Sequence, residues 1–176
     1  MNYADIKPND SVNGEGISVS LFVSGCTNCC KGCFNKETWD FNYGKEFTEK
    51  EMNYILDCIN KNGVMRNFSL LGGDPMHKKN LPTCIQILKK VKEVYPNITT
   101  YVWTGYLYED LLEEYGEEIF KDIDVLIDGP YKYWLNPGIG KVKWRGSTNQ
   151  RVINVPESLK LNKIVLMKDF AGKIIY

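Results

Sequence analysis

Four of the six cysteines in this chain of 176 residues lie within eight positions, at Cys26, Cys29, Cys30 and Cys33. Cysteines this close together form disulfides in oxidising compartments and bind metal ions or iron–sulfur clusters in reducing ones. The first residues contain no apolar segment of a secretory signal, and no apolar run approaches the ~20 residues that span a bilayer. We therefore expect a cytoplasmic protein whose cysteines are reduced.

The cysteine spacing is compatible with two kinds of metal site. Read as two C-x2-C pairs, the thiolates could bind one zinc ion, but structural zinc sites separate their pairs by about a dozen residues or more, and here the pairs adjoin. Read as C-x3-C-x2-C, Cys26, Cys30 and Cys33 could hold three corners of a [4Fe–4S] cluster and leave one iron open for chemistry. This spacing favours the cluster, with Cys29 as a bystander. A zinc-stabilised binding module without catalysis remains the alternative.

Short strands alternate with amphipathic helices along the chain. We expect strands at 17–25, 66–73, 98–105 and 123–129, and helices at 48–63, 81–95 and 107–120. Further strands are expected at 151–155 and 163–176, the last of them ending in a hairpin. This alternation predicts right-handed βαβ units and a largely parallel sheet, with the ligand beyond the carboxyl ends of the strands.

The chain length limits how far such a sheet can curl. A closed eightfold barrel takes about 250 residues. We therefore expect residues 1–176 to form a single α/β domain, a partial and open (β/α) barrel of five or six mainly parallel strands. An open side could admit something larger than a metabolite.

Glycines follow four of the expected strands, in the loops SGC, GGDP, TGY and DGP. A glycine lets backbone groups approach a ligand closely, so Gly72, Gly73 and Asp74 are candidate binding residues. Thr104 ends the next strand and is a further candidate for contact with a cofactor.

The overall charge excludes two classes of partner. Lys plus Arg and Asp plus Glu both number 22. A net charge near zero argues against binding to nucleic acid or to an anionic membrane through bulk charge. We expect neither partner, and we expect any other interaction to be local.

Five segments together resemble one protein family. They are GCTNCCKGCFNKETW, LLGGDP, YVWTGY, LIDGPY and WRGSTNQRVI, in this order along most of the chain. The three-cysteine spacing after the first strand of a βα pattern resembles the radical S-adenosylmethionine (SAM) superfamily. The full set resembles the activating enzymes of anaerobic ribonucleoside-triphosphate reductase.

This resemblance implies the cofactors and the residues that bind them. Cys26, Cys30 and Cys33 would bind a [4Fe–4S] cluster whose open iron binds SAM. The contacts to SAM would involve three segments, with the residues Gly32, Cys33, Phe34, Gly72, Gly73, Asp74 and Thr104. Many radical SAM proteins have an aromatic residue where this chain has Gly32, so Phe34 is expected to cover the adenine instead. No side chain is expected to act as an acid or base, because cluster and SAM carry the chemistry.

The resemblance also implies the reaction and its partners. An electron from a donor such as reduced flavodoxin would drive cleavage of SAM to methionine and a 5′-deoxyadenosyl radical. The radical would then remove a hydrogen atom from a glycine in the C-terminal loop of the reductase. The alternative is a small radical SAM enzyme similar to 7-carboxy-7-deazaguanine synthase, which acts on a small heterocycle. The segment NGEG at 13–16 keeps this alternative open.

Overall fold

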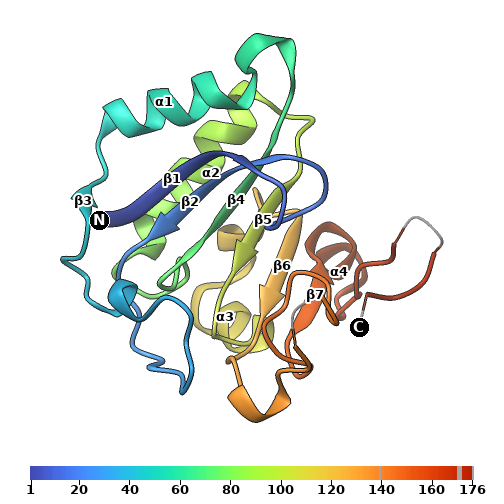
Figure 1. Cartoon of the computed structure of the whole chain (residues 1–176). Helices are drawn as coiled ribbons and strands as arrows, with labels where there is room; N and C mark the ends of the chain where they lie inside the picture. Colours follow the sequence, from blue (N-terminus) through green and yellow to red (C-terminus); the bar gives the residue numbers. More distant parts are fainter. Residues whose placement is uncertain (139, 170–171, 176) are drawn as a thin grey trace.

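The structure is a computed structural model that describes residues 1–138, 140–169 and 172–175. Its centre is one seven-stranded sheet with the strand order β3-β1-β2-β4-β5-β6-β7 (Figure 1). The first and last strands in this order do not pair with each other, so the sheet is open rather than a closed barrel. Among the described residues, no helix is long and apolar enough to cross a membrane.

The four central strands are parallel, as the sequence predicts. They are β2 (Ser18–Val23), β4 (Asn67–Gly72), β5 (Thr100–Trp103) and β6 (Val125–Asp128). Their pairing is parallel at each of the three contacts. The carboxyl ends of all four strands therefore lie at the same edge of the sheet, and so do the loops that follow them. In Figure 1 the cysteine loop and the loop after β6 both lie at the bottom of the sheet.

Three outer strands are antiparallel and raise the total above the expected five or six. β1 (Asn2–Asp10) pairs with β2, and the short β3 (Lys45–Glu46) pairs with β1. β7 (Arg151–Asn154) lies on the other side, against β6. The sequence does not predict β1, because this strand is polar and half-exposed. It also contains Pro8, a residue that sheets accept mainly at their edges. The expectation of mainly parallel strands holds for the centre of the sheet only.

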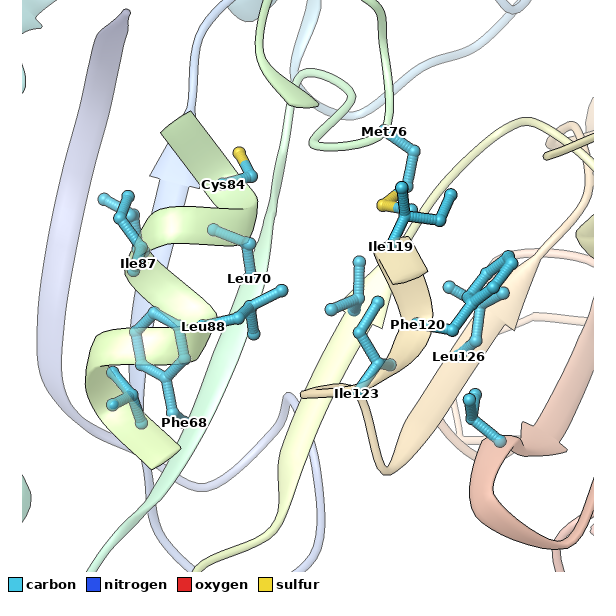
Figure 2. Close-up of a cluster of buried hydrophobic side chains, with 14 of the residues drawn as sticks. Phe68, Leu70, Met76, Cys84, Ile87, Leu88, Ile119, Phe120, Ile123 and Leu126 are labelled. Carbon is cyan, nitrogen blue, oxygen red and sulfur yellow. The ribbon is translucent and has the colours of Figure 1, made fainter. Parts of the chain in front are cut away.

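The helices cover one face of this sheet. They are α1 (Glu49–Ile59), α2 (Leu81–Val94), α3 (Tyr108–Tyr115) and α4 (Val155–Leu161), together with the 3-10 turn η3 (Glu117–Phe120). Three further 3-10 turns lie in connecting segments, namely η1 (Lys36–Trp39), η2 (Lys61–Gly63) and η4 (Tyr133–Leu135). Alternate residues of the strands, such as Leu21, Leu70 and Leu126, face these helices and are fully buried. Figure 2 shows this core, where α2 and η3 pack onto β4 and the strands beyond it.

The helix ends follow from local sequence. Thr48 and Glu51 form a capping box that starts α1. α1 ends at Ile59 instead of residue 63, because Asn62 and Gly63 adopt positive φ angles of 59° and 71°. α3 likewise ends before Gly116, at φ 75°, a conformation that glycine adopts without strain. The expected helices at 48–63 and 107–120 were therefore too long.

Loops and the C-terminal segment cover the opposite face. A second cluster there contains Tyr101, Val125, Ile127 and Val152, with Trp103 and Trp144 packed against it. Beyond α4, hydrogen bonds from Asn154 N to Val165 O and from Met167 N to Val152 O continue the pairing of β7. The expected C-terminal hairpin falls partly on 170–171 and 176, outside the described residues. The loop-covered face contains the cleft described next.

Candidate functional site

The cysteine loop starts where β2 ends and is fixed at its base by backbone hydrogen bonds. Gly25 N donates to Thr38 O at 2.7 Å, and Cys26 N donates to Trp39 O at 3.2 Å. Gly25 has φ +101°, and a Cβ atom there would lie 2.1 Å from Phe41 Cδ1. Only glycine fits this position. These two hydrogen bonds therefore hold the beginning and the end of the cysteine loop together at the edge of the sheet.

Three of the four clustered cysteines line a single cleft of about 910 Å³. Cys26, Cys30 and Cys33 are partly buried in its wall, whereas Cys29 is exposed, lies outside the cleft lining and has φ +44°. Burial raises the pKa of Cys26 to about 11 and also raises that of Cys30. A bound cation would offset this cost, because metal ligation favours the thiolate.

The positions of these thiols can be compared with the zinc site and the [4Fe–4S] site that the cysteine spacing allows. Cys26, Cys30 and Cys33 all line one cleft, where the C-x3-C-x2-C interpretation would place a cluster. Cys29, the fourth thiol that the two-pair zinc interpretation needs, is exposed and lies outside the cleft lining.

Asp74 joins the three loops at the carboxyl edge. Its side chain is 1% exposed. Oδ2 accepts hydrogen bonds from Asn28 Nδ2 at 2.9 Å and from Gly105 N at 3.0 Å, and Oδ1 accepts from Thr104 Oγ1 at 2.8 Å and from Met76 N at 3.0 Å. Burial raises the pKa of Asp74 to about 6, and the four hydrogen bonds oppose this rise. The carboxylate thus fixes the cysteine loop to the loops after β4 and β5.

Asn80 makes a second link that the sequence does not reveal. Its side chain is 2% exposed, and Nδ2 donates to Ser24 O, Gly25 O and Asp74 O at 2.9–3.2 Å. The amide thereby satisfies buried carbonyl groups on both sides of the cysteine loop's base. In the sequence, Asn80 looks like an ordinary residue before a helix.

The glycines of the GGDP loop have a clear structural cause. A Cβ at Gly72 would lie 2.6 Å from Val23 O, and a Cβ at Gly73 would lie 2.6 Å from Gly25 O. Both glycines therefore let this loop pack against the backbone that leads into Cys26. The loop also lines the cleft, and its contact with SAM stays a prediction.

Gly32 and Phe34 lie at the mouth of the cleft. Gly32 has φ +74°, and a Cβ there would lie 2.4 Å from the Tyr133 ring, so the cysteine loop touches the loop after β6 at this point. The side chain of Phe34 is 98% exposed. Its expected role over the adenine also stays a prediction, as does the contact of Thr104 with a cofactor.

Trp103 and Trp144 form the far wall of the cleft. Trp103 Nε1 donates to Trp144 O at 2.7 Å. Trp144 has φ +60°, which is a strained conformation for a bulky residue, and its ring packs against Tyr101 at 5.2 Å. Lys143 lies over the Trp144 ring and pairs with Glu15. The loop after β6 is thus attached to both β5 and the loop that follows β1.

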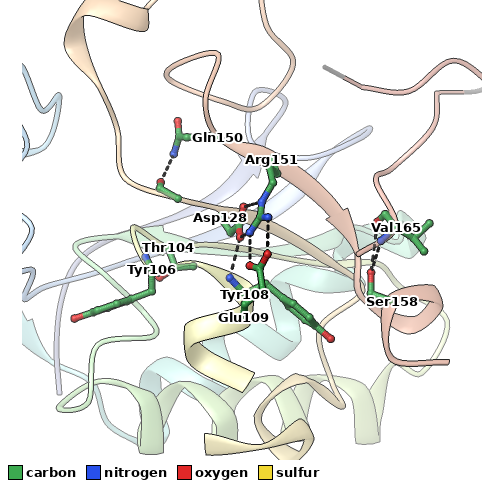
Figure 3. Close-up of polar contacts among 10 residues, drawn as sticks. Thr104, Tyr106, Tyr108, Glu109, Asp128, Gln150, Arg151, Ser158 and Val165 are labelled. Carbon is green, nitrogen blue, oxygen red and sulfur yellow. Dashed lines mark hydrogen bonds and ion pairs between the residues drawn. The ribbon is translucent and has the colours of Figure 1, made fainter. Parts of the chain in front are cut away.

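The stretch that follows Trp144 is a hydrogen-bonded network around β6 and β7 (Figure 3). Arg151 Nε donates to Asp128 Oδ1 at 2.9 Å, and its Nη2 also pairs with Asp128. The other side of the guanidinium binds Glu109 in α3, at 2.9 and 2.6 Å. Gln150 Nε2 donates to Gly129 O at 3.0 Å. Asp128 is fully buried. The network thus connects β6, β7 and α3 next to Gly129 and Gln150, which line the cleft.

The raised pKa of Asp74 predicts a pH-dependent stability. Because its folded-state pKa of about 6 exceeds the ~3.9 of an exposed carboxyl, Asp74 adds stability below about pH 4 that is lost as the pH rises to about 6. Asp74→Asn should remove this fall of about 2–3 kcal/mol in the free energy of unfolding. Urea denaturation at several pH values measures it. The exposed control Asp110→Asn should keep the wild-type slope, and equal slopes in wild type and Asp74→Asn would contradict the assignment.

Comparison with known proteins connects this cleft to a family. The family described as a 4Fe-4S single cluster domain matches residues 12–153. The anaerobic ribonucleoside-triphosphate reductase-activating protein of Pasteurella multocida is 42% identical over 152 residues, covering 85% of this chain and 95% of that protein. The proteins of the same name from Escherichia coli strain K12 and Enterobacteria phage T4 are each 38% identical, covering 86% of this chain and 97% and 93% of their own lengths.

Proposed function

The chain belongs to the family of anaerobic ribonucleoside-triphosphate reductase-activating proteins, and we propose that it activates such a reductase in the cytoplasm by installing a glycyl radical on it. The observation that carries this proposal is the placement of Cys26, Cys30 and Cys33 on one open cleft. The relatives do not favour the alternative of a small-heterocycle enzyme, since those cited share the reductase-activating name.

The described residues fit a [4Fe–4S] cluster and SAM. Cys26, Cys30 and Cys33 would bind three irons, and the fourth iron would face the cleft. The cleft lining also contains the residues expected to contact SAM, namely Gly32, Phe34, Gly72, Gly73, Asp74 and Thr104. When bound, the cluster and SAM would together supply a 5′-deoxyadenosyl radical, after an electron arrives from a donor such as reduced flavodoxin. The open sheet would then correspond to the partial barrel of radical SAM enzymes, in one catalytic domain.

The chain's own residues would position the reactants. Asp74 and Asn80 hold the cysteine loop against the loops after β4 and β5. These loops would therefore keep the two cofactors in fixed positions relative to each other. Trp103 and Trp144 provide an apolar wall of the cleft, and a hydrogen bond from Trp103 Nε1 to Trp144 O fixes them to each other. A cleft of about 910 Å³ is near the upper end of small-molecule sites, which span ~300–1,000 Å³. Such a cleft would leave room beside SAM for a glycine-bearing peptide.

A spectroscopic experiment tests the proposal. The anaerobically reconstituted protein is incubated with SAM, a chemical reductant and an anaerobic ribonucleoside-triphosphate reductase. We expect slow SAM cleavage by the protein alone, and a long-lived glycyl radical doublet by electron paramagnetic resonance once the reductase is added. A reductase whose C-terminal loop glycine is changed to Ala is the control and should give no doublet. Efficient turnover of a small heterocycle without a partner protein would refute the assignment.

A further inference from the structure

Charge is strongly segregated in this chain, although its net charge is zero. The four loops at the carboxyl edge, 24–44, 73–80, 104–107 and 129–150, contain Lys31, Lys36, Lys78, Lys79, Lys132, Lys141, Lys143 and Arg145 against Glu37, Asp40 and the buried Asp74. The rest of the chain therefore has an excess of acidic residues. The segment 107–120, which contains α3 and η3, has six acidic residues and no basic one. The cleft end of the molecule is positive and the helix side is negative.

Four of these lysines surround the cysteine loop. Lys31 lies between the ligand candidates Cys30 and Cys33, and Lys36 starts η1 in the same loop. Lys78 and Lys79 follow β4, and all four lysines are exposed. None of the four pairs with a carboxylate among the described residues.

The two loops that provide these lysines are packed together. Phe41, which follows η1, lies against the His77 ring with a centroid distance of 4.8 Å. The Lys79 ammonium is 4.6 Å from the centroid of the Phe41 ring. Lys36, Lys78 and Lys79 therefore lie on two loops that pack together, and Lys31 is in the same loop as Lys36. We call these four lysines the lysine patch.

The cysteine loop is itself at the surface. Cys29, Lys31 and Gly32 are exposed, and the side chain of Phe34 is 98% exposed. A cluster held by Cys26, Cys30 and Cys33 would therefore lie close to the lysine patch. Transient complexes between redox proteins use small interfaces and depend on charge steering for their association rate.

We propose that the lysine patch is the docking surface for an acidic protein that carries single electrons. This inference rests on the proposed function, because it assumes a cluster on the three cysteines. In the encounter one electron passes from the reduced donor to the cluster, the donor is oxidised by one electron, and no bond forms or breaks. The uncompensated ammonium groups bind carboxylates at the rim of the donor's cofactor.

Charge reversal next to the cluster tests this surface, with an acidic flavodoxin as the probe. Lys36→Glu/Lys78→Glu should weaken the binding of oxidised flavodoxin about tenfold and slow cluster reduction by reduced flavodoxin by at least the same factor. The dependence of both quantities on ionic strength should also become flatter. Reduction by photochemically reduced deazaflavin should not change. The matched control Lys61→Glu/Lys89→Glu alters exposed lysines outside the four loops at the carboxyl edge and should behave like the wild type.

Two results would overturn the proposal. One is an unchanged flavodoxin affinity and rate in Lys36→Glu/Lys78→Glu, or an equal loss in the control. The other is a normal response to flavodoxin with a reduced glycyl radical yield under deazaflavin, which would assign the patch to the reductase. Failure of the proposed function is distinguishable, since the wild type would then not cleave SAM even with deazaflavin. The affinity for oxidised flavodoxin and its salt dependence would still report on the surface.

Discussion

Replacing Cys26, Cys30 or Cys33 with Ala will abolish cluster binding and SAM cleavage, whereas Cys29→Ala will retain most of both. The three thiols that are predicted to bind the cluster line the cleft, and Cys29 is exposed outside it. A cubane cluster that lacks one of three protein ligands would not keep its open iron in place. Iron and sulfide analysis after anaerobic reconstitution should give about four of each per chain for the wild type and for Cys29→Ala. Formation of 5′-deoxyadenosine provides the second readout.

The Cys29 variant is the matched control, because it removes a thiol from the same loop. Loss of the cluster in Cys29→Ala together with its retention in Cys30→Ala would show that the ligand set is wrong. Zinc at one ion per chain with no iron would support the binding-module alternative instead. Metal analysis of the wild type therefore distinguishes an iron–sulfur protein from a zinc-binding module.

Arg151→Met will lower the free energy of unfolding by about 3–5 kcal/mol, the usual cost of leaving a buried charge without its partner. Asp128 is fully buried, and Arg151 supplies two of its hydrogen bonds. The third comes from Tyr108 N at 2.9 Å. Urea denaturation of the anaerobic protein measures the loss. The double variant Asp128→Asn/Arg151→Met should recover part of it, because the unpaired charge is then gone.

Glu109→Gln tests the other half of the same ion-pair network. Glu109 contacts the same guanidinium, but its side chain is 53% exposed. Solvent screening limits such a pair to about 1 kcal/mol or less. A loss in Glu109→Gln as large as in Arg151→Met would mean that burial of Asp128 does not determine the energetics of this network.

The sequence predicts the centre of the fold because those residues are patterned by their own burial. β2, β4, β5 and β6 are largely apolar runs with a glycine at their end or within two residues after it, and α1 and α2 have clear apolar stripes. β1 carries no such pattern, since β3 pairs only with its residues Asn2 and Tyr3 and the rest of β1 lies beside β2 alone among the described strands, where a polar sequence is tolerated. Its pairing with β2 is decided by tertiary contact rather than by local preference.

Some features of the candidate site can likewise be predicted from the sequence, and others cannot. The spacing of Cys26, Cys30 and Cys33 makes them ligand candidates without any structure, and the structure places all three on one cleft. The partners of Asp74 could not be predicted, because Asn28, Thr104 and Gly105 come from loops that meet only when the sheet has formed. The same holds for Asn80, which bonds Asp74 O within its own loop and Ser24 O and Gly25 O in the cysteine loop. Contact of Gly73 with SAM stays a prediction, and in the structure a Cβ at Gly73 would meet the Gly25 backbone.

The antiparallel outer strands would affect how a protein substrate binds and dissociates. A parallel barrel closes by adding parallel strands at its edges, but here β1 and β7 run against their neighbours on either side. The sheet is therefore open at both of its edges as a result of its topology. A peptide loop of a large folded partner could enter sideways and leave again without being threaded through a ring. Release of such a partner would be ordinary dissociation, so one activating molecule could serve many copies in succession.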